Sequence, residues 1–284
     1  MASIVYEMET LQVFRENSVV TVTINQPKKK NAINAQMWDG LAEIFREIAS
    51  RADDRVVVVT GAGDDFCSGA DLSGRGGSSD AGGAGAASAG AASSVGAQNQ
   101  VHHLAAMRRV NDACIALQRL PQPTIAKVRG VAVGAGCNLA LGCDLVVASQ
   151  TARFSEIFAR RGLSLDFGGS WLLPRRIGMH RAKELALLAE IVGASDALEM
   201  GLINRVLPDE EVDAFVENWA RKLAAGPPIA LAQTKRLLNN SLNVTLEEAL
   251  DDEAAAQTIN FATSDTAEAM RAFIEKREPK FTGR

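Results

Sequence analysis

The sequence contains no apolar run of about 18 residues, the length that a membrane-crossing helix needs. Its first residues, MASIVYEMET, include Glu7 and Glu9 and lack the apolar segment of a signal peptide. Its four cysteines form neither a CxxC motif nor the Cys/His spacing of a metal site. We therefore expect a cytoplasmic protein with buried, reduced cysteines and no metal ion.

An excess of positive charge is also missing. The chain has 30 Lys and Arg against 34 Asp and Glu, which gives a formal net charge of −4 at pH 7. Nucleic-acid-binding proteins usually show the opposite balance, so a nucleic acid is not an expected partner. A membrane is not expected either, because the long apolar run is lacking. The 284 residues are 47% hydrophobic and 23% charged, as in a soluble globular protein with one large core.

The pattern of apolar residues over 1–208 predicts an α/β core. Alternation and continuous β-branched runs predict strands, and the segment after Asn34, a good N-cap residue, has apolar residues at helical spacing. Strands alternating with helices indicate crossover units. The predicted strands cover residues 19–24, 55–61, 124–136, 144–149 and 203–207. The predicted helices follow Asn34, follow Cys137 and cover residues 181–188.

The C-terminal part, residues 209–284, is predicted to be helical throughout. Strand signals vanish after residue 208, and helical patterns cover residues 209–225, 228–240, 245–262 and 264–278. A second segment, residues 73–100, consists almost entirely of Gly, Ala and Ser and is predicted to be a flexible insertion in the core. Two interpretations of it stay open: a tolerated surface insertion, or a mobile lid.

Two glycine-rich turns follow buried strands, with the sequences CSGAD (67–71) and VGAGCN (133–138). Backbone N–H groups in such turns attract negative charge, and two turns facing one point would form an oxyanion hole. A dinucleotide site is disfavoured because GAGCNL lacks the third glycine of GxGxxG. Either turn alone would be interpreted as a simple tight turn.

Five segments together carry a resemblance to a known family: QPKKKNAIN (26–34), FCSGADL (66–72), RGVAVGAGCNLALGCDLVVAS (129–149), GGSWLLPRRIG (168–178) and AFIEKREPKFTGR (272–284). In this combination the sequence resembles the crotonase superfamily, the enoyl-CoA hydratase/isomerase family. The resemblance implies an α/β fold, a spiral of ββα units followed by helices that form trimer contacts. It also implies a homotrimer or homohexamer that acts on acyl-CoA substrates.

The resemblance assigns roles to individual residues. The backbone N–H groups of Ala70 and Ala135 are expected to bind the thioester oxygen. The first turn consists of small residues because its functional group is a main-chain amide and not a side chain. Coenzyme A would be part of the substrate, so no separate cofactor is expected. Substrate-binding positions implied by the family are Lys30, Ala32, Gly69, Asp71, Leu72, Gly136, Asn138, Phe158 and Lys276. Asp71 is also expected to cap the turn that follows it.

The acidic residues favour one chemistry within the family. Family hydratases use two glutamates, whose matching positions here are Asn138 and Phe158. Asp166 matches the catalytic aspartate of family isomerases, most closely the branch that rearranges ring epoxides, although Leu165 replaces the usual proline. The sequence therefore predicts an isomerase with Asp166 as its base. A hydratase and a catalytically silent acyl-CoA-binding protein remain the alternatives.

Two further interpretations concern single carboxylates. The apolar neighbours of Asp166 in the sequence favour a raised pKa and a usable base, whereas a helix N-cap is the competing interpretation. Glu156 is a substitute acid, although an exposed or ion-paired glutamate is the interpretation favoured at that position.

Overall fold

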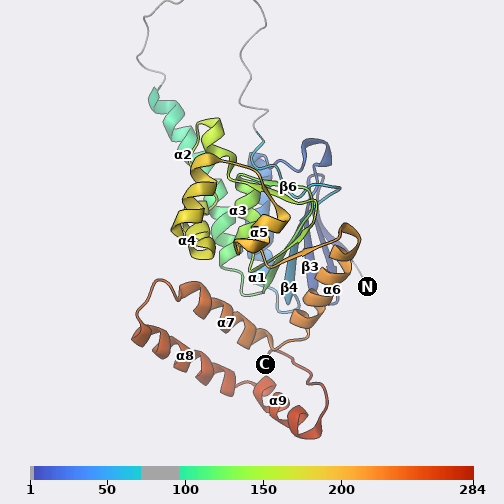
Figure 1. Ribbon diagram of the computed structural model, residues 1–284. Helices are drawn as coiled ribbons and strands as arrows, with labels where there is room; N and C mark the ends of the chain where they lie inside the picture. The colour runs from blue at the N-terminus through green and yellow to red at the C-terminus, as the bar shows by residue number, and fades with distance from the viewer. Residues whose placement is uncertain (1–2, 72–95) are drawn as a thin grey trace, which may run out of the picture.

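The computed structural model describes residues 3–71 and 96–284 (Figure 1). Most of the predicted insertion, as well as Leu72, therefore lies outside the described residues. The exception is residues 96–100, which begin the long helix α2 (Gly96–Gln118) instead of belonging to an irregular segment.

A seven-stranded sheet forms the centre of the molecule, in the order β1-β2-β3-β4-β5-β7-β10. The pairs β1–β2 and β2–β3 are antiparallel, and every other pair in this sheet is parallel. The predicted strands 19–24, 55–61, 144–149 and 203–207 are confirmed as β3, β4, β7 and β10. The bounds are β1 Ser3–Met8, β2 Leu11–Glu16, β3 Val19–Ile24, β4 Val56–Gly61, β5 Thr124–Val128, β7 Leu145–Ser149 and β10 Arg205–Leu207.

Both faces of the sheet are covered at β4, which explains the continuous valine run of this strand. Val57 and Val59 face a core shared with α1 (Ala35–Ala49), α2 and α3 (Ala135–Gly142). Val56 and Val58 face the opposite side, where they pack against α6 (Asp209–Ala224). A strand that is buried on both faces has no polar side to present, so it shows no alternation. Figure 1 shows α6 on the other side of the sheet from α1 and α3.

The connections between parallel strands are helical, as predicted. Helix α1 links β3 to β4 and begins at the expected cap, because the Asn34 side chain accepts a 3.0 Å hydrogen bond from the Met37 N–H. Helix α2 packs against α1 and leads into β5. Helices α4 (Gly169–Leu188) and α5 (Ala194–Glu199) lie between β7 and β10. None of the helices in the described ranges is long and apolar enough to cross a membrane.

A second, three-stranded sheet carries the glycine-rich turns. Its order is β6-β8-β9, with β6 Val131–Val133, β8 Arg153–Ser155 and β9 Val192–Gly193. The strand predicted over 124–136 is therefore wrong as one element: the chain bends at Gly130, whose φ is +51°, and changes sheets. A β-bridge between Cys67 and Ala132 then joins the first turn to β6.

The predicted C-terminal helices are confirmed as α6 and three more, α7 (Pro228–Asn240), α8 (Leu246–Phe261) and α9 (Ser264–Glu275). Figure 1 shows α7, α8 and α9 as an arm beside the α/β body. A salt bridge of 2.8 Å between Lys235 Nζ and an Asp144 carboxylate oxygen ties this arm to the body. The division of the chain at residue 208 into core and helical region stays a prediction, since α6 packs on the sheet.

Candidate active site

The loop before α1 and the first glycine-rich turn are joined by main-chain hydrogen bonds. Ser68 N–H donates to the Lys30 carbonyl (2.9 Å), and Ile33 N–H donates to the Gly69 carbonyl (2.8 Å). Asp71 N–H in turn donates to the Ile33 carbonyl at 2.8 Å. These bonds align the two segments like parallel strands, as the bridge between Ile33 and Ala70 also shows. Two predicted substrate-binding segments that are far apart in sequence are thus neighbours.

Asn31 holds this arrangement together from inside the protein. Its side chain is fully buried and its backbone φ is +55°, a region that asparagine tolerates better than most residues. The amide oxygen accepts from Gln26 N–H at 2.9 Å, and Nδ2 donates to the carbonyls of Ala62 (2.9 Å) and Asp65 (2.6 Å). Our sequence analysis did not single out Asn31, although an asparagine in a loop between a strand and a helix is a usual sign of left-handed backbone.

The second turn leads directly from β6 into α3. Gly134 has φ +57° and donates its N–H to the Ser155 carbonyl at 2.8 Å. Ala135 is the first residue of α3, so its N–H has no acceptor within the helix. Within the described residues, neither the Ala70 N–H nor the Ala135 N–H donates to a protein acceptor.

Glycines let these two turns approach each other. Gly69 has φ +94°, and a Cβ there would lie 2.8 Å from the Val133 carbonyl oxygen and 3.6 Å from the Ala135 nitrogen. A Cβ at Gly136 would lie 2.3 Å from the Cys67 carbonyl oxygen, inside contact distance. The structure thus brings Gly69, Ala135 and Gly136 together. The oxyanion hole expected between the turns stays a prediction.

Phe158 lies beside the second turn. It belongs to the short 3₁₀ helix η2 (Ile157–Arg161) and is buried, and its ring edge lies 3.6 Å from where a Cβ on Gly134 would stand. An apolar ring therefore lines this side of the turn.

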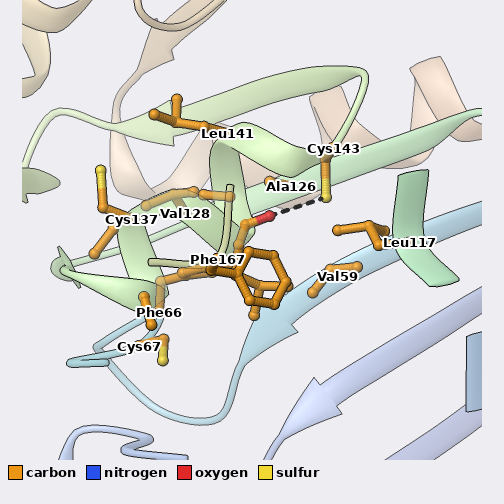
Figure 2. Close-up of a cluster of buried hydrophobic side chains, with 14 of the residues drawn as sticks. Val59, Phe66, Cys67, Leu117, Ala126, Val128, Cys137, Leu141, Cys143 and Phe167 are labelled. Atoms are coloured by element: carbon orange, nitrogen blue, oxygen red, sulfur yellow. Dashed lines mark hydrogen bonds between the residues drawn. The ribbon is translucent and has the colours of Figure 1, made fainter. Parts of the chain in front are cut away.

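Asp166 is positioned by its buried neighbour Phe167. The Phe167 ring is fully buried and lies 5.3 Å, centroid to centroid, from the Trp38 ring. Figure 2 shows the Phe167 ring in the same buried cluster as Phe66, Cys67 and Cys137. The Asp166 side chain is only partly buried. The alternative interpretation of Asp166 as a helix cap is wrong: α4 has Gly168 at its N-cap, without a capping side chain.

Asn138 connects the Asp166 loop to Glu156. Its side chain is fully buried, and Nδ2 donates to the Asp166 main-chain carbonyl (3.0 Å) and to Glu156 Oε2 (3.2 Å). A Cβ at Gly169 would lie 2.5 Å from this Nδ2, so glycine at 169 leaves room for the amide. Asn138 is therefore a structural link between α3 and the segment before α4.

Glu156 is the residue that our sequence analysis placed wrongly. The favoured interpretation was an exposed or ion-paired glutamate, but the residue is 1% exposed and has no salt-bridge partner in the described chain. The pKa of its carboxyl is raised to about 7, mainly by burial; the Cys137 thiol and the Asn138 amide partly offset this rise, and the Asp166 charge adds to it. A group with this pKa changes charge near neutral pH.

The remaining predicted residues are more scattered. Ala32 is buried in the loop before α1, and Asp71 pairs with Lys29 at 2.7 Å. Lys30 is exposed, forms a 3.6 Å ion pair with Asp65, and lines a cleft with Arg129 and Arg153. Lys276 is exposed at the end of α9 in the arm, away from both turns of its own chain (Figure 1).

Comparison with known proteins agrees with this arrangement. A model of the enoyl-CoA hydratase/isomerase family matches residues 14–86 and 80–284. The 1,2-epoxyphenylacetyl-CoA isomerase of Escherichia coli K12 is 36% identical over 277 residues, covering 98% of this chain and 100% of that protein. A probable enoyl-CoA hydratase of Rhodobacter capsulatus is 37% identical over 267 residues, covering 94% and 95%.

A solved structure gives the same result. The crystal structure of a putative enoyl-CoA hydratase from Streptomyces coelicolor A3(2) superposes with a TM-score of 0.87 at 35% identity, covering 99% of this chain and 97% of that one. Two sheets, the facing glycine-rich turns and the C-terminal helices define an enzyme of the crotonase fold, and the predicted fold class is confirmed. The chain belongs to the enoyl-CoA hydratase/isomerase family.

Proposed function

We propose that the protein is an acyl-CoA isomerase that moves a double bond or rearranges a ring epoxide through an enolate. The observation that carries this proposal is the placement of one partly exposed carboxylate, Asp166, in the loop bonded to Asn138. The positions that hold glutamates in family hydratases carry an amide, Asn138, and an apolar ring, Phe158, and neither is an effective proton carrier. The E. coli relative named as an isomerase supports the same choice.

For a double-bond shift, the proposed mechanism uses one base. The Asp166 carboxylate takes a proton from the carbon next to the thioester carbonyl, and the electron pair of that C–H bond forms an enolate. The N–H groups of Ala70 and Ala135 hold the enolate oxygen. The protonated carboxyl then returns the proton to C4, the far carbon of the original double bond, so the double bond now lies between C2 and C3 and Asp166 ends as it began. Coenzyme A is part of the substrate, and the chain's own groups carry the reaction.

The test is the Asp166→Asn variant, assayed by steady-state kinetics with both 3-enoyl-CoA and 2-enoyl-CoA. We expect isomerisation to fall by about 10²–10⁴, the usual contribution of general acid–base catalysis. Acyl-CoA affinity, measured by calorimetry, should change little because the amides of the two turns remain. Asp112→Asn, an exposed change on α2, is the matched control. Isomerisation unaffected by Asp166→Asn would contradict the proposal.

Hydration of 2-enoyl-CoA is the second candidate, favoured by the name of the R. capsulatus relative. Vigorous hydration that survives Asp166→Asn would support it over isomerisation. Acyl-CoA binding without isomerisation or hydration would instead identify a catalytically silent acyl-CoA-binding protein. The four free cysteines suit a reducing compartment, and we place the enzyme in the cytoplasm.

A further inference from the structure

Glu156 lies behind the reacting groups rather than among them. It follows β8 and precedes η2, and its side chain points to the N-terminal half of α3, where Asn138 donates to Oε2 at 3.2 Å. The same Asn138 Nδ2 donates to the main-chain carbonyl of Asp166 at 3.0 Å. With 1% exposure, Glu156 has no route to a bound substrate. Glu156 must therefore affect Asp166 indirectly, by its hydrogen bond with Asn138 and by its own charge.

The surroundings of this carboxyl suit a neutral group. Oε1 has no hydrogen-bond partner among the described residues, and no Lys, Arg or His of the described chain lies within salt-bridge distance. Buried ionised carboxylates are normally paired or accept several hydrogen bonds. The ionisable groups that face Glu156 are the Cys137 thiol on α3 and the Asp166 carboxyl before α4; Cys114 on α2 in turn faces Asp166. Each of these groups is neutral when protonated and negative when ionised, so none of them neutralises a negative charge on Glu156.

We propose that Glu156 is a positioning residue that works in its protonated form. It holds the Asn138 amide against the main chain of Asp166 and keeps a second negative charge away from the base and the enolate. This inference rests on the proposed isomerase function of Asp166.

The direction of the pH effect follows from these charges. Asp166 must be ionised to accept a proton, so activity rises with pH on the acid side. Loss of the Glu156 proton, near neutral pH, then places a negative charge close to a reaction that itself develops negative charge. Repulsion between two like charges in a partly buried site corresponds to about a ten- to hundredfold effect on the rate. We therefore expect an alkaline fall in kcat of about this size.

Glu156→Gln tests the proposal because glutamine has the same length and is neutral at every pH. We expect kcat at pH 6 to stay within about threefold of the parent, with KM unchanged, and the alkaline fall to disappear. Glu156→Leu, which removes the acceptor for Asn138, should instead lower kcat across the whole pH range. An alkaline fall that persists in Glu156→Gln would overturn the proposal. So would loss of activity at every pH in Glu156→Gln, because Glu156 would then move a proton itself.

A second measurement does not depend on turnover. Carbon-13 NMR of the protein labelled at the glutamate side-chain carboxyl follows each Glu through a pH titration, and the signal missing from Glu156→Gln identifies the residue. We expect that signal to change with a midpoint near neutral pH. A Glu156 signal that is ionised from pH 5 upward would overturn the inference even if the enzyme isomerises. If the protein shows no isomerase activity but the Glu156 midpoint lies near neutral pH, the proposed function is refuted, whereas the inference that Glu156 is protonated stands.

Discussion

At the scale of single residues, several glycines of the site are important because a larger residue would not fit at their positions. The Gly136 position allows α3 to touch the backbone of Cys67, and the Gly169 position allows the Asn138 amide to approach α4. Asn138 and Glu156 are large by comparison, yet both are buried and bonded to each other. The geometry of the site is therefore sensitive to one added methyl group at a glycine and to one added charge at Glu156.

Gly136→Ala should separate the two turns. The new Cβ would meet the Cys67 carbonyl oxygen, so α3 must shift and carry the Ala135 N–H away from Ala70. We expect kcat for the proposed isomerisation to fall by about 10²–10³, the usual cost of one oxyanion donor. Steady-state kinetics measures this, with circular dichroism to confirm folding. Gly193→Ala, where the nearest neighbouring atom of an added Cβ is 3.9 Å away, is the control. Equal kcat values for the two variants would contradict the expectation.

Glu156 should make stability fall with rising pH. Its carboxyl pKa is about 7 in the folded protein against an ordinary value of 4.5, so the folded state binds more protons between these pH values. The contribution of the neutral group is complete below the unfolded pKa and is lost as pH rises through the folded pKa. The free energy of unfolding of the parent should drop by about 3 kcal/mol relative to Glu156→Gln between pH 4.5 and 8. Urea unfolding at several pH values measures the difference, and parallel curves would show that Glu156 is ionised throughout.

At the scale of elements, the loop that precedes α1 is as important as the regular structure. Its main chain pairs with the first turn, and the buried Asn31 side chain joins it to residues beyond β4. Because the same loop contains Lys30 and Ala32, its position determines where the implied coenzyme A contacts lie relative to Ala70. A local change at Asn31 should therefore affect both stability and substrate binding.

Asn31→Ala removes three hydrogen bonds and places alanine at φ +55°. We expect the free energy of unfolding to fall by about 2–4 kcal/mol, since buried carbonyl and N–H groups lose their partners. The KM for acyl-CoA should rise with a smaller change in kcat. Denaturant unfolding and steady-state kinetics provide the two measurements. Asn25→Ala, which loses one exposed hydrogen bond to the Glu9 carbonyl, is the control and should lose less than about 1 kcal/mol.

At the scale of the whole molecule, the C-terminal arm has a surface that suits subunit contacts. Helices α7, α8 and α9 stand beside the α/β body and carry large apolar side chains that a single chain leaves exposed (Figure 1). Exposed apolar residues that form a large continuous patch usually mark an interface. The exposed apolar residues on these helices and their connection are Leu238, Leu242, Leu246, Leu250, Ile259, Phe261, Met270, Phe273 and Ile274.

We propose that this arm builds a homotrimer or a dimer of trimers, with Lys276 near the substrate site of a neighbour. Light scattering at micromolar concentration should give three or six times the chain mass of 30.1 kDa. Phe273 is 82% exposed in one chain, so Phe273→Asp should weaken assembly through a buried charge, whereas Phe273→Leu should preserve it. A mass of one chain for the parent protein would rule out this assembly.

Much of the fold was predictable because its signals are local. The continuous valines of β4 indicate a strand covered on both faces, and Asn34 before an apolar periodic segment marks the start of α1. The glycine-rich turns and Asp166 could be recognised because a short motif carries their residue types and spacing. The helices of the C-terminal region were likewise predicted by their own periodicity, within a few residues at each end.

The sequence by itself determined several strands of the central sheet, most of the helices and the two glycine-rich turns, and it pointed to Asp166 as the base of the site. Only the tertiary structure decided that the chain changes sheets at Gly130, that Asn31 joins its loop to the segment after β4 and that Glu156 is buried against Asn138. The physical reason is that burial and pKa depend on residues far away in the chain. Glu156 is 18 positions from Asn138, and no local pattern records that the two side chains are buried against each other.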